Sequence, residues 1–158
     1  MTRRAARPTD TFLRPLLQQS YPKQEWTEAD VERRLEEEGI HHADDTRLAY
    51  CHLTYPVRTE PLGPVPVGPC TQIATLIPQH RKQKWVDEVL APLLAEALRR
   101  EAKERPDLME QPLYCYLDPD LYPFWTSIIP VEIIPRRSGS YLAWLPTVND
   151  ALERLVDY

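Results

Sequence analysis

Four stretches of the chain place apolar residues at the three- and four-residue spacing of an amphipathic helix. Three of them follow a side chain that can cap a helix start: Asp10 or Thr11 precedes the first, Thr27 the second and Thr147 the last. An acid, Asp30, lies three positions after Thr27, as in a capping box. We therefore predict helices over residues 11–21, 28–38, 85–105 and 148–155.

Proline and glycine set limits on these helices. Pro15 is tolerable only if it falls in the first turn, and Gly39 is a natural residue just past the end of the second helix. Pro92 conflicts with a regular hydrogen-bond ladder in the long third helix, so it predicts either a kink or a late start.

Strand-like runs fill most of the remaining chain. Residues 47–57 and 70–77 are rich in apolar and aromatic side chains, and residues 113–117 form a short apolar run. Because a strand, the long helix and a strand follow one another from residue 70 to 117, we expect those two strands to be parallel.

Turn residues define the connections. Between residues 59 and 69 the chain has four prolines and two glycines, which predict a stiff loop. Residues 118–127 predict one or two helical turns, and residues 131–134 and 140–144 predict a closing hairpin. With 158 residues the chain suits one domain, residues 1–158, of the α/β (α+β) class.

Charge and hydropathy exclude several classes of protein. The net charge of −5 argues against general nucleic-acid binding, which needs a broad basic field. No apolar run approaches the roughly 20 residues that span a bilayer, and the first residues lack the apolar segment of a signal peptide. We therefore expect a cytoplasmic protein that makes no membrane contact.

Cys51, Cys70 and Cys115 are widely separated, with no Cys-x-x-Cys pair and no histidine at zinc-ligand spacing. The sequence therefore predicts neither a disulfide framework nor a metal site. All three cysteines lie in apolar runs, so we expect small buried side chains in a reducing compartment.

A basic turn between the second strand and the long helix is the strongest sign of chemistry. His80, Arg81, Lys82 and Lys84 stand just before the expected helix start, where unpaired backbone N–H groups and the helix dipole favour an anion. The alternative is a solvated turn between two core elements.

This order of elements, together with a strand at residues 3–7, resembles the GCN5-related N-acetyltransferase (GNAT) family over most of the chain. Pro78 and Arg81 match the family's Pro-x-x-Arg step, which leads into a glycine-containing turn that holds the pyrophosphate of acetyl-CoA. Lys84 and Val86 stand where the family has glycine, and they would narrow or reshape the phosphate cradle. The resemblance implies a mixed central sheet with helices on both faces.

The segment 118–127 is similar to a second family element, a short helix whose tyrosine protonates the leaving thiolate. Trp125 stands in the place of that tyrosine, and an indole is no useful proton donor near neutral pH. Tyr122, one helical turn earlier, is the substitute that the resemblance implies, with packing as the alternative role.

The resemblance thus implies acetyl-CoA as cosubstrate, without a metal, and an amine acceptor that the sequence does not identify. Tyr122 would be the general acid, and the candidates for the base are His52, His80 and Glu60, among which spacing does not choose; we take His52 with Tyr122 as the catalytic pair. A backbone N–H near Leu76 would polarise the thioester. The residues expected to bind acetyl-CoA are Thr75, Leu76, Ile77, Arg81, Lys82, Gln83, Lys84, Trp85, Val86 and Trp125.

Two other readings remain open from sequence. The first is a fold of this kind without catalysis, acting as a binding or assembly module. The second is a small nucleic-acid-associated protein that uses the basic turn and Arg136 with Arg137, which the net negative charge disfavours. A homodimer could form through residues 141–144 if that strand lies at a sheet edge.

Overall fold

The computed structural model describes residues 10–44, 49–78, 86–119, 122–129 and 131–155. Six strands form the main sheet: β1 (Ile40–Asp44), β2 (Ala49–Thr54), β5 (Thr71–Pro78), β6 (Leu113–Leu117), β7 (Glu132–Pro135) and β8 (Tyr141–Leu145). A separate two-stranded ladder pairs β3 (Val57–Arg58) with β4 (Gly68–Pro69). The helical segments are α1 (Asp10–Ser20), α2 (Glu28–Glu36), η1 (Val86–Leu90), α4 (Ala91–Glu104), η2 (Pro106–Glu110), α5 (Tyr122–Ile128) and α6 (Val148–Arg154).

The strand order in the main sheet is β1-β2-β5-β6-β8-β7, and β5–β6 is the parallel pair among otherwise antiparallel neighbours. The expected parallel pair and the expected closing hairpin are therefore confirmed, as is the α+β class in one domain. β8 lies between β6 and β7, so the condition on which residues 141–144 could pair with a second copy, a place at a sheet edge, is not met.

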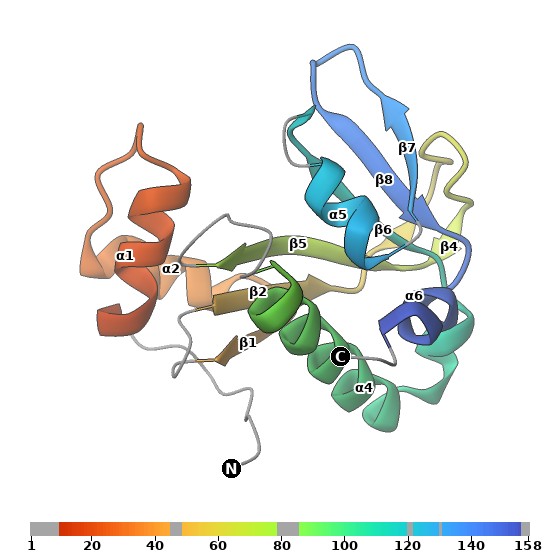
Figure 1. The fold of residues 1–158 in the computed structure, drawn as a ribbon, viewed down its shortest axis with the longest axis horizontal. Helices are drawn as coiled ribbons and strands as arrows, with labels where there is room; N and C mark the ends of the chain where they lie inside the picture. The colour runs from red at the N-terminus through yellow and green to blue at the C-terminus, as the bar shows by residue number, and fades with distance from the viewer. Residues whose placement is uncertain (1–9, 45–48, 79–85, 120–121, 130, 156–158) are drawn as a thin grey trace.

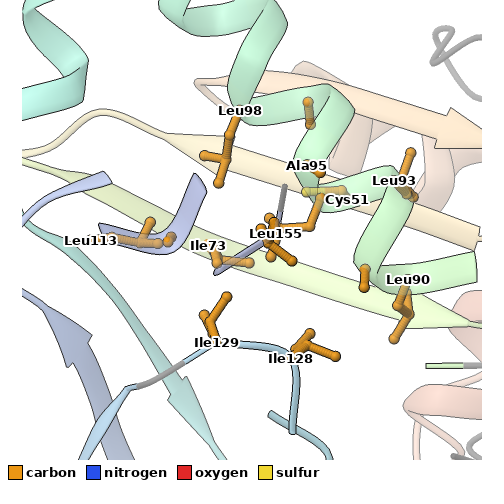
Figure 2. Close-up of a cluster of buried hydrophobic side chains, with 14 of the residues drawn as sticks. Cys51, Ile73, Leu90, Leu93, Ala95, Leu98, Leu113, Ile128, Ile129 and Leu155 are labelled. Carbon is orange, nitrogen blue, oxygen red and sulfur yellow. The ribbon is translucent and has the colours of Figure 1, made fainter. Parts of the chain in front are cut away.

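Helices cover both faces of this sheet (Figure 1). On the face that we call the α4 face, the helices α4, α5 and α6 bury the largest apolar cluster. Figure 2 shows part of it, in which Leu93 and Leu98 of α4 lie near Cys51 of β2 and Ile73 of β5. All three cysteines are buried, as expected.

The opposite face, called the α2 face, carries two smaller clusters. α1 and α2 bury Leu13, Leu17 and Val31 against Tyr50 and Ile77 of the sheet. Over the other half of the sheet, the proline-rich segment 59–70 packs two buried side chains, Val65 and Cys70, against Tyr114 and Leu142. The segment is thus a stiff cover, held further by the β3–β4 ladder.

The expected helix caps form. The Thr27 hydroxyl accepts a hydrogen bond from the Asp30 N–H at 3.2 Å, and the Asp30 carboxylate accepts one from the Thr27 N–H at 3.0 Å. Thr147 caps α6 in the same manner, accepting from the N–H of Asp150 at 3.1 Å. These bonds satisfy N–H groups that the first turn leaves without a helical partner.

Gly39 does not lie just past the end of the second helix, as had been expected. α2 ends at Glu36, and Gly39 enters β1 with a φ of 111°. A Cβ at this position would lie 2.2 Å from the carbonyl oxygen of Leu53. Glycine is therefore needed because β1 and β2 approach each other closely there.

One further prediction needs correction, one strand was missed, and one predicted strand is not tested. Pro15 lies in the second turn of α1, on its exposed side, where it removes one ladder hydrogen bond. β1, with the sequence IHHAD, was not predicted because it has neither a clear apolar alternation nor β-branched residues beyond Ile40. The expected strand at residues 3–7 lies outside the described residues.

The long helix begins irregularly, as Pro92 predicted. Residues Val86–Leu90 form a π-helical turn, and regular α-helix starts only at Ala91, with Pro92 in its first turn. Because proline has no N–H to bond to the preceding turn, it interrupts the regular ladder between the two segments. The buried side of the two segments matches the expected apolar stripe and adds one carboxylate, Glu101.

Candidate functional site

The parallel strands β5 and β6 separate and leave a cleft between them. They pair only at their beginnings, where Thr71 lies opposite Leu113 and Gln72 opposite Tyr114. Beyond that point a cleft of about 260 Å³ opens, lined by residues 73–77 of β5 and 115–117 of β6. In Figure 1, β6 and the β7–β8 hairpin turn away from the direction of β5.

A β-bulge lies where the cleft begins. Opposite the consecutive β2 residues His52 and Leu53 stand Thr75 and Ile73 of β5, so Ala74 is an extra residue in β5. A bulge of this type bends its strand and increases the local twist. We attribute the separation of β5 from β6 to this bend, and the exposed Ala74 itself lines the cleft.

The cleft exposes a strand edge. β5 pairs with β2 along one edge from Gln72 to Pro78, but residues 74–77 have no strand partner on the β6 side within the described structure. Alternate backbone N–H and C=O groups of this edge face the cleft. An extended ligand that contains amides can hydrogen-bond to such an edge as an added strand would.

Side chains from four further segments complete the cleft. Trp125 of α5 approaches from the α4 face, where it also packs against the main apolar cluster. Tyr21, which follows α1, lies on the side of the α2 face. Asp118, directly after β6, and Ser140, directly before β8, line the opposite wall. The cleft thus combines aromatic walls with one carboxylate.

Four of the residues expected to bind acetyl-CoA therefore lie together: Thr75, Leu76, Ile77 and Trp125 all line the cleft. Val86 does not line it; its side chain is buried in the main cluster. The basic-turn residues of the prediction, Arg81, Lys82, Gln83, Lys84 and Trp85, lie outside the described residues, as does His80. The next described residues after the turn include two acids, Asp87 and Glu88, in the first turn of the helical segment.

Of the two expected catalytic residues, Tyr122 and His52, only His52 has a described side chain. Tyr122 begins α5 one turn before Trp125, and its side chain is outside the described structure. His52 is 1 % exposed and is not among the cleft residues, although its ladder partner Thr75 is. Glu60, another candidate base, is exposed in the proline-rich segment away from the lining residues.

His52 belongs to a polar network under α2. Its Nε2–H donates to the carbonyl oxygen of Glu38 at 2.8 Å, and its ring stacks on that of His41 at a centroid distance of 4.1 Å. His41 donates through Nε2 to the Glu37 carbonyl oxygen at 3.2 Å, which leaves Nδ1 to accept from Tyr50 at 2.5 Å. Burial lowers the pKa of His52, so the ring is neutral near pH 7.

Arg34 of α2 joins this network to the cleft. Its guanidinium donates to the hydroxyl of Thr75, which lines the cleft, and to the hydroxyl of Tyr50. Its Cζ also lies 5.9 Å from the centre of the Tyr21 ring. Sequence analysis missed Arg34, because only the folded chain brings the middle of α2 next to β5.

On the opposite wall, Arg136 is held over the cleft residue Tyr116. Its Cζ lies 4.3 Å from the ring centre, and its Nη1 donates to the Ser140 hydroxyl at 3.0 Å. Sequence analysis also missed Asp118 as a cleft residue. One signal was present: side chains directly after a parallel strand meet at the edge of the sheet where ligands bind.

A second polar cluster lies on the α4 face, away from the cleft. The Tyr55 hydroxyl donates to Glu101 Oε1 at 2.5 Å, and His42 Nε2 lies 3.6 Å from Glu101 Oε2. Arg105 packs its guanidinium over the Tyr55 ring at 4.1 Å. None of these residues lines the cleft. Since Glu101 of α4 and His42 of β1 are both buried, their contact holds α4 against the sheet.

Neither a protein-family model nor a curated protein nor a solved structure matches the chain. Within the described ranges, no three histidine, cysteine, aspartate or glutamate side chains are grouped so as to hold a metal ion. The helices described are each too short or too polar to cross a membrane.

Proposed function

We propose that the protein is a divergent GNAT-like acyltransferase that moves an acetyl group from acetyl-CoA directly to an amine. The observation that carries this proposal is the cleft between the separated parallel strands β5 and β6, with the bulge at Ala74 where it opens. The strand order β1-β2-β5-β6-β8-β7, with helices on both faces, supports the resemblance seen in the sequence.

The cleft suits the acyl-carrying arm of CoA. That arm is an extended chain with two amide groups, which can bond to the open edge of β5 over residues 74–77. Trp125 and Leu76 offer apolar surface beside this edge. Since the described helix start carries Asp87 and Glu88, the positive charge that the pyrophosphate needs comes from Arg81 and its basic neighbours in the sequence.

The reaction uses the open edge of β5 and, as the resemblance implies, Tyr122. The amine nitrogen attacks the thioester carbon, and a backbone N–H of β5 near Leu76 donates to the oxygen as it becomes negative. The tetrahedral intermediate then collapses, breaking the carbon–sulfur bond and releasing the CoA thiolate. Tyr122 gives its proton to that thiolate.

Before attack, the acceptor must lose the proton of its ammonium group. Asp118 lines the cleft, and we therefore assign its carboxylate as the base, in place of the buried His52. A proton passes from the ammonium to Asp118, and the amine lone pair becomes available for attack. The attacking nitrogen loses its second proton to solvent as the intermediate collapses, Asp118 then releases its proton to solvent, and Tyr122 is restored by a proton from solvent.

Thermal unfolding with and without acetyl-CoA tests binding. At a ligand concentration of about 100 times the dissociation constant, the native state gains about 2.7 kcal/mol, which is a shift of several degrees. Ala74→Trp fills the cleft from an exposed position and should abolish the shift. Val67→Trp, at an exposed position that does not line the cleft, should leave it unchanged.

Transfer is tested separately, by mass spectrometry of an amine mixture incubated with protein and acetyl-CoA. Acetylated products that require the native cleft support the enzyme. A thermal shift abolished by Ala74→Trp, without any product, would instead favour the binding module. An absence of any shift with acetyl-CoA would refute the transferase and would leave only a module that does not bind acetyl-CoA.

A further inference from the structure

Two arginines contact residues that line the cleft, one on each of its walls, and neither arginine is itself a lining residue. Arg34 bonds to Thr75 on the β5 wall, and Arg136 lies over Tyr116 on the β6 wall. We propose that the acceptor is a small amine that also carries a carboxylate, as an amino acid does, and that these arginines bind the carboxylate. This inference rests on the proposed function, because it names the acceptor of the same cleft.

Both arginines lie on the α2 face. Thr75 stands two residues before Ile77, which packs in the cluster beneath α1 and α2. Tyr116 stands two residues after Tyr114, whose side chain belongs to the cluster beneath the proline-rich segment. Since side chains alternate along a strand, Tyr116 shares the face of Tyr114. The acceptor is therefore expected to enter from this face, while Trp125 closes the cleft from the other.

The charge of Arg34 is only weakly compensated. Its partners Thr75 and Tyr50 are neutral hydroxyls, and its acidic partner, Glu37, lies 3.7 Å away with a side chain that is 51 % exposed. The Arg34 Nε is buried and has no hydrogen-bond partner in the described structure. A half-buried guanidinium in this state attracts an anion more strongly than a solvated one.

Arg136 is exposed but fixed in place. The Tyr116 ring supports its guanidinium, and Ser140 accepts one of its N–H groups. Ser140 also exchanges a hydrogen bond of 2.9 Å with Ser138 in the same turn. No carboxylate pairs with Arg136 in the described part of the chain, so its remaining donors can bind a carboxylate in two-point geometry.

The carboxylate of Asp118 suits the ammonium end of such an acceptor. Asp118 lines the same cleft, next to the end of β6. An ammonium group is attracted to this carboxylate, while the arginines attract the acid group. With about 260 Å³ shared between the acyl arm and the acceptor, the acceptor is a small molecule.

The test compares individual amino acids with their C-terminal amides, and aspartate and glutamate with asparagine and glutamine. Binding is measured by the thermal shift of the protein alone, and transfer by thiol release from acetyl-CoA. We expect at least one free acid to bind, and to be acetylated, about tenfold better than its amide, since a charge-assisted hydrogen bond contributes at least that factor.

Arg136→Gln should reduce that preference to near unity, and because Arg136 is exposed the variant should keep its fold. Arg136→Lys, which keeps the charge without the planar fork, should give an intermediate value. The neighbouring exposed residue provides the control: Arg137→Gln should behave as the unaltered protein. Arg34→Gln should also lose the preference, and its melting temperature reports whether it is folded.

The two proposals fail in different ways. Acetyl transfer to amides as readily as to free acids, or a preference that survives Arg136→Gln, would overturn the acceptor assignment and leave the acetyltransferase in place. Binding of a free acid that depends on Arg136, without any transfer, would support the arginine site and count against the transferase. Absence of binding to every free acid overturns the assignment.

Discussion

The Tyr55 hydroxyl and the Glu101 carboxylate form a hydrogen bond of 2.5 Å, which ties the residue after β2 to the last turn of α4. Glu101 is 8 % exposed, and its other neighbour, His42, is 3.6 Å away. Tyr55→Phe removes the hydroxyl and leaves one oxygen of the buried Glu101 carboxylate without this hydrogen-bond donor. We expect unfolding free energy to fall by about 1–3 kcal/mol in urea titrations. Tyr116→Phe, at an exposed ring, should cost less than about 0.5 kcal/mol, and equal losses would contradict this account.

Stability should depend on pH through two buried histidines. Burial lowers the pKa of both His42 and His52 below the usual value of 6.5. Below pH 6.5 the unfolded chain therefore binds more protons than the folded one, so stability decreases as pH falls. For His42 the surrounding charged groups, Glu101, Arg100, Glu96 and His41, act in both directions, and burial is the largest cause.

The measurement is the urea midpoint between pH 7.5 and 5.5, a window in which few carboxylates titrate. The midpoint should fall across this window in the unaltered protein. His42→Gln should make the dependence shallower, because one of the two groups no longer titrates. An identical slope in both proteins would show that His42 does not contribute.

Gly39 and Gly139 offer a matched pair of substitutions. Both have positive φ, 111° and 91°, so alanine is strained at either position. A Cβ at Gly39 would also meet the Leu53 carbonyl oxygen at 2.2 Å, whereas nothing lies within 4 Å at Gly139. Gly139→Ala should cost about 1 kcal/mol, and Gly39→Ala roughly 1–3 kcal/mol more, measured by thermal unfolding. Similar costs would mean that β1 moves to relieve the contact.

The cysteines should be unreactive in the folded protein. Burial raises the pKa of Cys51, and that of Cys115 to about 12, while Cys70 is buried and donates its S–H to the Pro56 carbonyl oxygen at 3.3 Å. At pH 8 an aromatic disulfide reagent should label all three only after unfolding. Rapid labelling of the native protein would contradict the burial. If the native protein is not labelled, the same reagent can measure the CoA thiol released by transfer.

Tyr122→Phe tests the general acid. If Tyr122 protonates the thiolate, kcat should fall by about a hundredfold while affinity for acetyl-CoA changes little. Trp125→Phe, which alters the cleft wall, should mainly weaken acetyl-CoA binding. Equal loss of kcat and affinity in Tyr122→Phe would indicate a packing role.

Local signals in the sequence were sufficient for much of the fold. Thr27 and Asp30 marked the start of α2, the run at 113–117 coincided with β6, and Pro92 indicated the late start of α4. These features depend on residues close together in the chain. β1 was missed because two histidines obscure its pattern, and its pairing with β2 is a tertiary effect.

The candidate site was less predictable. Thr75, Leu76, Ile77 and Trp125 were anticipated through the resemblance, and they do lie together in the cleft. The approach of Arg34 to Thr75 joins residues 41 positions apart, which no local pattern encodes. The same holds for His52: its strand was predicted, but which face it would occupy depends on register.

The fold of this domain does not require Ala74. Without that one residue, His52 and Leu53 would still meet Thr75 and Ile73, and each side chain would keep its present face, now in an uninterrupted ladder. Folding therefore gains nothing from the insertion, which interrupts pairing and bends a central strand. A variant from which Ala74 is deleted should be at least as well ordered as the parent, yet offer a straight strand with no room beside it for a guest molecule.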